Sequence, residues 1–152
     1  MGNTYSVQSV GDFTISFVHP LIAGGANITF TGFKLEGNII DADQMLDNSK
    51  VVLLIDGAIT ITNSARAGTI KLTCVKTSDD PNKGDVTAIA NILSSAGDSQ
   101  GGTMRVSFGL NGVPIARSFI GSTLKRCKPL IVDGNDVPDY GIEFNYQDWL
   151  PI

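Results

Sequence analysis

Apolar and polar residues alternate with a period of two along several short segments of this chain. In residues 13–17, for example, Phe and Ile alternate with Thr and Ser. Because successive side chains of a strand point to opposite faces, this pattern predicts strands with one face in a core. The outward positions are rich in Thr and Ser, so that face can enter an interface at low desolvation cost. The same alternation occurs at residues 28–31, 59–62, 70–74, 104–108 and 142–145.

One segment has a helical period instead. Pro81 suits the first position of a helix, where its missing N–H costs nothing, so Asp80 or Ser78 is the expected N-cap. Gly97 is the expected C-terminal stop. A single narrow apolar stripe predicts a helix that lies against a sheet. The stripe, spaced i, i+3, i+4 and i+7, consists of Val86, Ile89, Ala90 and Leu93.

Turn signals divide the strand patterns. Residues 51–55 are apolar at every position, which predicts a strand covered from both sides. Asp56-Gly57 and Asn111-Gly112 each join two strand patterns, and such dipeptides predict tight hairpins because they tolerate positive φ. Pro129 lies in the short run 128–132, which is therefore expected to be an edge strand or to start after the proline.

The segment from Phe33 to Ser49 has no clean period. Apolar residues are scattered among polar ones, and long irregular stretches inside a compact domain are often functional. Either this segment docks on another subunit, or it covers the core of its own chain. The residues expected to form a subunit contact in the first case are Phe33, Leu35, Ile39, Ile40, Met45 and Leu46.

The 152 residues fit one domain, spanning 1–152. The expected fold is mainly β: a β-sandwich or split antiparallel β-barrel with one α-helix and a long extended loop. Charged residues make up only 17% of the chain, against about 25% in ordinary soluble domains. This deficit favours a protein that hides surface against copies of itself. The net charge of −4 argues against nucleic-acid binding, which needs clustered Lys and Arg.

The sequence offers no catalytic or metal-binding constellation. His19 is the only histidine, and it cannot form a triad or a zinc site with two distant cysteines, Cys74 and Cys127. The acidic run at residues 41–48 lacks the central glycine and closing glutamate of an EF-hand. We therefore expect no enzymatic activity, no catalytic or metal-binding residues and no cofactor.

Neither a membrane span nor a secretory signal is expected. The apolar run at residues 51–55 is far too short to cross a bilayer, and the first residues lack a basic region and an apolar region. The two cysteines are accordingly expected to be free thiols.

The order of these patterns resembles the tail tube proteins of contractile-tailed bacteriophages, whose fold is shared by tailocin and secretion-system tubes. A strand pattern at residues 65–72 leads through Lys76-Thr77-Ser78 into a single helix, after paired strands and a long loop. The resemblance covers most of the chain, from Gly11 to Tyr146. The segments that follow the helix in the same order are residues 103–108, 118–124, 125–129 and 141–144.

This resemblance implies a structural, self-assembling subunit. Six copies would join edge to edge into a ring with an inner β-barrel, and rings would stack into a tube inside a contractile sheath. Residues 33–49 would reach the neighbouring ring, and DNA would pass through an acidic lumen without specific binding. The implied partners are further copies of the chain, the sheath and the baseplate. The implied location is the virion tail, after synthesis in the host bacterial cytoplasm.

A different class of function remains open from the residues alone. A monomeric β-sandwich can be a binding module for a carbohydrate or protein ligand, and such sites use exposed aromatic side chains. The candidates near the C-terminus are Tyr140, Tyr146 and Trp149. The alternative for Trp149 is that it packs the end of the chain against the core.

Overall fold

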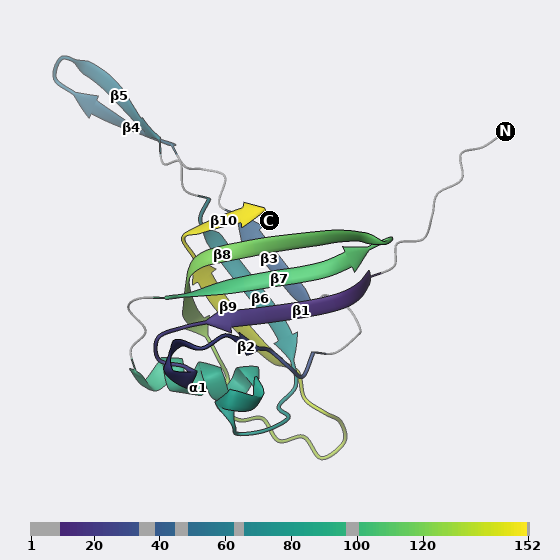
Figure 1. The fold of residues 1–152 in the computed structure, drawn as a ribbon. Helices are drawn as coiled ribbons and strands as arrows, with labels where there is room; N and C mark the ends of the chain where they lie inside the picture. The colour runs from purple at the N-terminus through teal and green to yellow at the C-terminus, as the bar shows by residue number, and fades with distance from the viewer. Residues whose placement is uncertain (1–9, 34–38, 45–48, 63–65, 97–100, 152) are drawn as a thin grey trace.

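The computed structural model describes residues 10–33, 39–44, 49–62, 66–96 and 101–151. Strands dominate these residues, and one α-helix accompanies them (Figure 1). The strands are β1 (Val10–Val18), β2 (Ile28–Thr29), β3 (Ile40–Gln44), β4 (Ser49–Leu54), β5 (Gly57–Thr62), β6 (Gly68–Cys74), β7 (Gly102–Leu110), β8 (Val113–Arg126), β9 (Tyr140–Tyr146) and β10 (Asp148–Pro151). The helices are the 3₁₀ turns η1 (Ala23–Gly25) and η2 (Pro81–Lys83) and the α-helix α1 (Val86–Ala96).

Eight of the strands form one antiparallel sheet in the order β2-β1-β7-β8-β9-β6-β3, with β10 paired to β8. The long strand β8 belongs to two layers. Its residues 113–122 pair with β7, whereas residues 123–126 pair with β9. In Figure 1 the strands β1, β7 and β8 accordingly cross in front of β3, β6 and β9. The described residues do not close this sheet into a barrel, and the predicted mainly β fold with one helix is confirmed.

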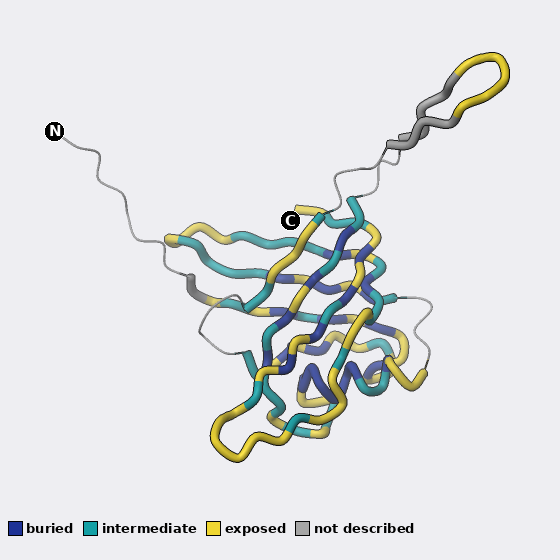
Figure 2. Tube along the Cα trace, turned by 180° about the vertical axis from the view of Figure 1, so that it is seen from behind, coloured by how far each residue is buried: buried dark blue, intermediate teal, exposed yellow. Residues whose placement is uncertain are grey.

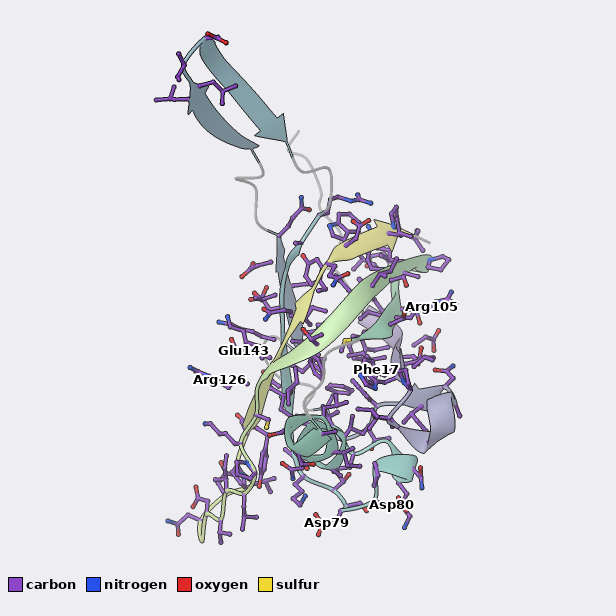
Figure 3. All side chains as sticks on the ribbon, turned by 90° about the vertical axis from the view of Figure 1, so that its left-hand side faces the viewer. Phe17, Asp79, Asp80, Arg105, Arg126 and Glu143 are labelled. Atoms are coloured by element: carbon purple, nitrogen blue, oxygen red, sulfur yellow. The ribbon has the colours of Figure 1, made fainter. Side chains whose placement is uncertain are left out.

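The core lies between the two layers. The rings of Phe17 on β1 and Phe144 on β9 meet with centroids 5.8 Å apart, and those of Phe119 and Tyr146 meet at 5.0 Å. In Figure 3 the side chain of Phe17 points inward, whereas Glu143 lies outside one layer. Strand β6 shows the burial alternation that its sequence predicts. The period-two pattern therefore identified the core faces of residues 13–17, 28–31, 70–74, 104–108 and 142–145, whereas residues 59–62 lie in the separate β4–β5 hairpin and are not part of the described core.

The helix α1 begins later than its sequence suggests. Pro81 starts the 3₁₀ turn η2, and Asp80 caps that turn by accepting a hydrogen bond from Asn82 N at 3.0 Å. The cap of α1 is Asp85, whose Oδ1 accepts from Ala88 N at 3.0 Å. The expected C-terminal stop, Gly97, lies outside the described residues. The predicted apolar stripe is buried: Val86, Ile89, Ala90 and Leu93.

Both predicted hairpins form, but the turn between β4 and β5 consists of Ile55 and Asp56 instead of Asp56 and Gly57, and this hairpin lies in unexpected surroundings. Asn111 and Gly112 join β7 to β8 with φ of 51° and 80°, as a two-residue turn requires. Strands β4 and β5 form a separate two-stranded sheet, which stands clear of the body in Figure 1. Residues 53–55 of this hairpin are exposed, so the prediction that 51–55 is covered from both sides is wrong. No second layer lies over them among the described residues.

Two other expectations need correction. Part of the segment 33–49 that looked irregular is strand β3, paired with β6 in antiparallel register from Ile40↔Leu72 to Gln44↔Gly68. Residues 128–132 form no strand and belong to the loop between β8 and β9. A proline near the start of that run removes a backbone donor, which favours the irregular course.

Candidate assembly surfaces

The tip of the β4–β5 hairpin is the most exposed apolar feature of the described chain. Leu53 is 82% exposed, Leu54 is 53% exposed and Ile55 is fully exposed. The three residues are consecutive and occupy the end of the hairpin farthest from the body (Figure 2). A contiguous exposed apolar patch of this kind marks an interaction site or an aggregation hazard. We call Leu53, Leu54 and Ile55 the hairpin tip.

The residues predicted to contact another subunit are only partly described. Leu35, Met45 and Leu46 lie outside the described residues. Phe33 and Ile40 are half-buried and pack against the chain's own core. Ile39 is half-buried, and its carbonyl accepts a hydrogen bond from Thr73 N. The subunit contact at these positions remains a prediction.

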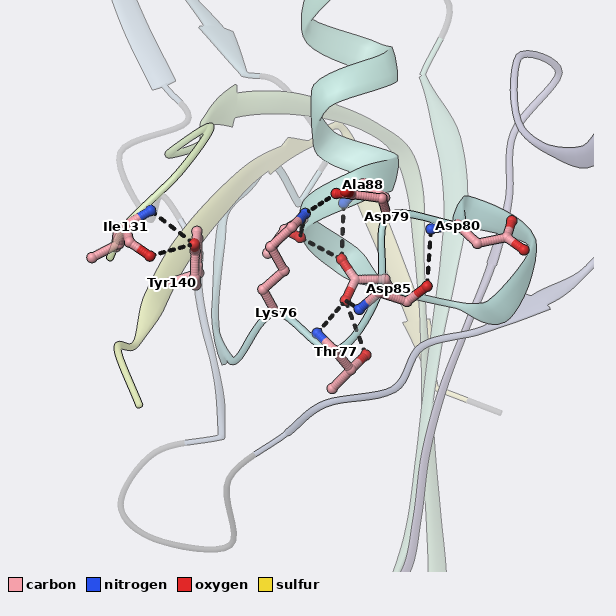
Figure 4. A network of polar contacts seen from close by, with 10 residues as sticks. Lys76, Thr77, Asp79, Asp80, Asp85, Ala88, Ile131 and Tyr140 are labelled. Carbon is pink, nitrogen blue, oxygen red and sulfur yellow. Dashed lines mark hydrogen bonds and ion pairs between the residues drawn. The ribbon is translucent and has the colours of Figure 1, made fainter. Parts of the chain in front are cut away.

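A second exposed apolar surface lies at the opposite end of the molecule, in the loop between β8 and β9. Figure 2 shows this loop as an exposed extension below the body, away from the hairpin. Tyr140 anchors this loop through two hydrogen bonds to Ile131. The Tyr140 hydroxyl accepts a hydrogen bond from Ile131 N at 2.8 Å and donates one to Ile131 O at 3.2 Å (Figure 4). The exposed apolar residues of the loop between β8 and β9 are Leu130, Val132 and Val137, and we call these three residues the far loop.

The sheet also has a strand with an open edge. Within the described part of the chain, β3 ends the strand order and pairs with β6 alone. An edge of this kind presents backbone N–H and C=O groups that another strand can use. Asp41 and Asp43 of β3 are exposed, and charges at an edge limit uncontrolled pairing.

A row of alternating charges crosses the outer face of the same layer. Glu143 on β9 lies 3.7 Å from Lys71 on β6 and 3.6 Å from Arg126 on β8, measured between charged atoms. Figure 3 shows Glu143 and Arg126 on the same side of the sheet. Because Lys71 and Arg126 are well exposed, each pair contributes little to stability. The row makes this face polar.

The most elaborate polar network supports α1 and is structural. The buried carboxylate of Asp85 accepts hydrogen bonds from Thr77, Ser78, Thr87 and Ala88 (Figure 4). Burial alone raises the pKa of Asp85, but these hydrogen bonds outweigh it and lower the pKa from 3.8 to about 2. Such a carboxylate stays ionised and serves as a clamp between the loop after β6 and the helix.

Two of the remaining titratable candidates, His19 and Cys74, are buried in the core, and Cys127 is only partly buried. His19 is buried, and its Nδ1 accepts from Leu21 N at 3.1 Å. Cys74 and Cys127 are free thiols, and burial together with the charges of Asp85 and Asp139 raises the pKa of Cys74 to about 12. Among the described residues, no three His, Cys, Asp or Glu side chains are grouped to hold a metal ion.

The aromatic candidates for a glycan platform do not form one. Tyr140 and Tyr146 are buried, with exposures of 2% and 3%. Trp149 is half-buried and packs against the core, as the structural alternative predicted. In the described part of the chain, no helix is long and apolar enough to cross a membrane.

Comparisons with known proteins place the fold. No known protein family matches the chain, and no curated protein sequence is similar to it. A chain in the cryo-EM structure of the anti-feeding prophage (AFP) baseplate, 6-fold symmetrised, has a TM-score of 0.59 at 12% identity, over 100% of this chain and 97% of that chain. A chain in the cryo-EM structure of the AFP tube-terminating cap has a TM-score of 0.51 at 10% identity, over 100% and 94%. This protein therefore shares its fold with chains of these two structures.

Proposed function

We propose that the protein is a structural subunit of a contractile tail or injection apparatus, without catalytic activity or cofactor. Full-length fold similarity to chains of the AFP baseplate and tube cap supports this class of function. The more specific proposal is a tail tube subunit that forms hexameric rings, which stack into a conduit for DNA. Its partners are then copies of itself, a sheath and a baseplate, and its location is the assembled particle.

The observation that carries the proposal is the hairpin tip. Three consecutive exposed apolar residues on a projecting arm would promote aggregation of a protein that functions as a monomer, so they favour a role in an interface. Transfer of these side chains into an interface is favourable by roughly 25 cal/mol per Å² of apolar surface buried. The arm is therefore suited to reach a neighbouring subunit.

The far loop is our candidate for the receiving surface. The two apolar surfaces lie at opposite ends of the molecule, one on a β-hairpin and the other on an irregular loop (Figures 1 and 2). A contact between unlike surfaces is head-to-tail, and repeated head-to-tail contacts generate filaments when they do not close. The hairpin tip and far loop would thus connect successive rings, whereas the open edge of β3 would serve contacts within a ring.

Negative-stain electron microscopy of the purified full chain tests the proposal. We expect rings or tubes from the parent protein and none from the variant Leu53→Ser/Leu54→Ser/Ile55→Ser. The matched control is Val113→Ser, which removes a similarly exposed apolar side chain from the β7–β8 turn. This control should assemble like the parent. Tubes formed by the triple variant, or a parent that stays monomeric at high concentration, would contradict the proposal.

A further inference from the structure

Gln44, the last residue of β3, precedes the β4–β5 hairpin along the chain, and Arg66 follows the hairpin just before β6. We call Gln44 the departing end and Arg66 the returning end of the hairpin arm. Both ends contact the side chain of Trp149 in β10. Because a projecting arm takes its direction from its attachment, this shared contact bears on where the hairpin tip points.

The returning end is held by several contacts. The Arg66 guanidinium lies over the Trp149 ring, with its central carbon 4.0 Å from the ring centroid. Its Nη2 also donates to the Trp149 carbonyl oxygen at 2.6 Å, and its backbone N donates to Asp148 Oδ1 at 3.2 Å. A planar guanidinium that both stacks and hydrogen-bonds has little orientational freedom.

The departing end is tied to the same indole. Trp149 Nε1 donates to Gln44 Oε1 at 2.8 Å. The preceding residue is fixed as well, because the Tyr146 hydroxyl donates to the carbonyl oxygen of Asp43 at 2.7 Å. The indole is thus a bridge between the two points where the arm joins the body.

Trp149 itself belongs to a strand of the main sheet. Strand β10 pairs with β8, which places Trp149 opposite the buried Phe119, and the indole packs against the core. A second guanidinium, that of Arg117, lies 5.7 Å from the ring centroid. Trp149 therefore does more than cover the core: through its contacts with Gln44 and Arg66 it also connects the arm to the main sheet.

We propose that Trp149 is a positioning residue that fixes the direction of the hairpin before a partner subunit binds. The inference rests on the proposed role of the hairpin in assembly. An arm that already points in its bound direction loses less conformational freedom on docking, and this preorganisation increases affinity. Trp149 would then promote assembly from outside the interface, acting through Gln44 and Arg66.

Pulsed EPR distances test the bridge on single subunits. Spin labels are placed at Asp56→Cys in the hairpin and at Asn135→Cys in the loop between β8 and β9. The background carries Cys127→Ser, and Leu53, Leu54 and Ile55 are replaced by Ser to prevent assembly. We expect one narrow distance distribution, which broadens on Trp149→Ala. The neighbouring change Leu150→Ala is the control and should leave the distribution narrow, because Leu150 is 44% exposed and pairs with Ser118 of β8.

Arg66→Met provides a second variant in case Trp149→Ala fails to fold, as judged by circular dichroism. It keeps the aliphatic stem but removes the stacking and the donor to the Trp149 carbonyl. A distribution that stays as narrow as the parent's in every folded variant overturns the inference.

Assembly is then measured with the hairpin tip restored and the labels omitted. A weakening of docking by 1.4 kcal/mol corresponds to about a tenfold higher critical concentration, and we expect a shift of this order for Trp149→Ala and Arg66→Met. Leu150→Ala should not shift it. An unchanged critical concentration in folded bridge variants overturns the inference. If the parent forms no assembly at all, the proposed function fails, while the EPR distances still decide whether Trp149 orients the arm.

Discussion

The Oδ2 atom of Asp85 accepts a hydrogen bond from the backbone N of Thr77 at 2.7 Å, although eight positions separate the two residues along the chain. The same carboxylate also caps α1 through Ala88. One buried side chain thus joins the loop after β6 to the helix that covers the end of the core.

Replacement of Asp85 by Asn is expected to destabilise the fold. The amide NH₂ would face N–H groups that now donate to a carboxylate oxygen, leaving buried donors unpaired. We expect a loss of about 2–3 kcal/mol in the free energy of unfolding, measured by urea denaturation. Asp79→Asn is the control: that carboxylate is 90% exposed and pairs with Lys76 at the surface, so its loss should change little. Equal stabilities of the two variants would contradict a structural role for Asp85.

The stability of the fold should depend on pH through the ionisation of the Asp85 carboxylate. The pKa of Asp85 is about 2 in the folded protein against an ordinary 3.8, so its contribution is complete above 3.8 and is lost as pH falls towards 2. A shift of this size corresponds to roughly 2 kcal/mol. The stability difference between the parent and Asp85→Asn should therefore shrink between pH 4 and pH 2. A difference that stays constant over this range would show that the charge of Asp85 is not what stabilises the fold.

The two thiols should differ in reactivity. Cys74 is buried and has its pKa raised to about 12, so it supplies almost no thiolate at neutral pH. Cys127 is partly exposed. A thiol reagent should label one cysteine in the native protein and both in denaturant, and Cys127→Ser should abolish the native reaction. Rapid native labelling of the Cys127→Ser variant would show that the core around Cys74 opens readily.

Substitution by Ala should change the stability of the fold at one of two glycines on adjacent strands and leave it nearly unchanged at the other. A Cβ at Gly68 would lie 1.8 Å from the carbonyl oxygen of Asp43, so the β3–β6 pairing must give way. We expect Gly68→Ala to lower the free energy of unfolding by about 1–3 kcal/mol. A Cβ at Gly141 meets nothing within 4 Å, so Gly141→Ala should be tolerated. Comparable melting temperatures for the two variants would mean that β3 is not held where the structure places it.

The sequence predicted well those features that local chemistry decides. The apolar stripe from Val86 to Leu93 and the Asn111-Gly112 turn follow from periodicity and backbone preference within a few residues. The caps expected for the helix were Asp80 and Ser78, and Asp85 was not among them. The structure uses Asp80 for η2 and Asp85 for α1. Only the tertiary contacts of Asp85 with Thr77 separate these roles.

The candidate surfaces could not be predicted from local patterns. An all-apolar run such as residues 51–55 is compatible both with a strand buried on both faces and with an exposed arm. The apolar pattern does not say whether another layer of the protein covers the strand. Trp149 and Gln44 are separated by 105 positions, so nothing in the sequence places the indole against the base of the arm. One available signal was composition: few charges in a chain of this size favour apolar surface reserved for assembly.

Disulfide cross-linking distinguishes a head-to-tail contact from a symmetric one. In a Cys127→Ser background, we expect oxidation of an Ile55→Cys/Val132→Cys variant to give a ladder of covalent multimers. The hairpin that carries residue 55 and the loop that carries residue 132 lie at opposite ends of the folded subunit, so this disulfide can form only between subunits (Figure 2). Ile55→Cys alone and Val132→Cys alone are the controls and should stay monomeric under denaturing electrophoresis. Dimers from Ile55→Cys alone would instead indicate tip-to-tip pairing, which closes after two subunits and cannot build a tube.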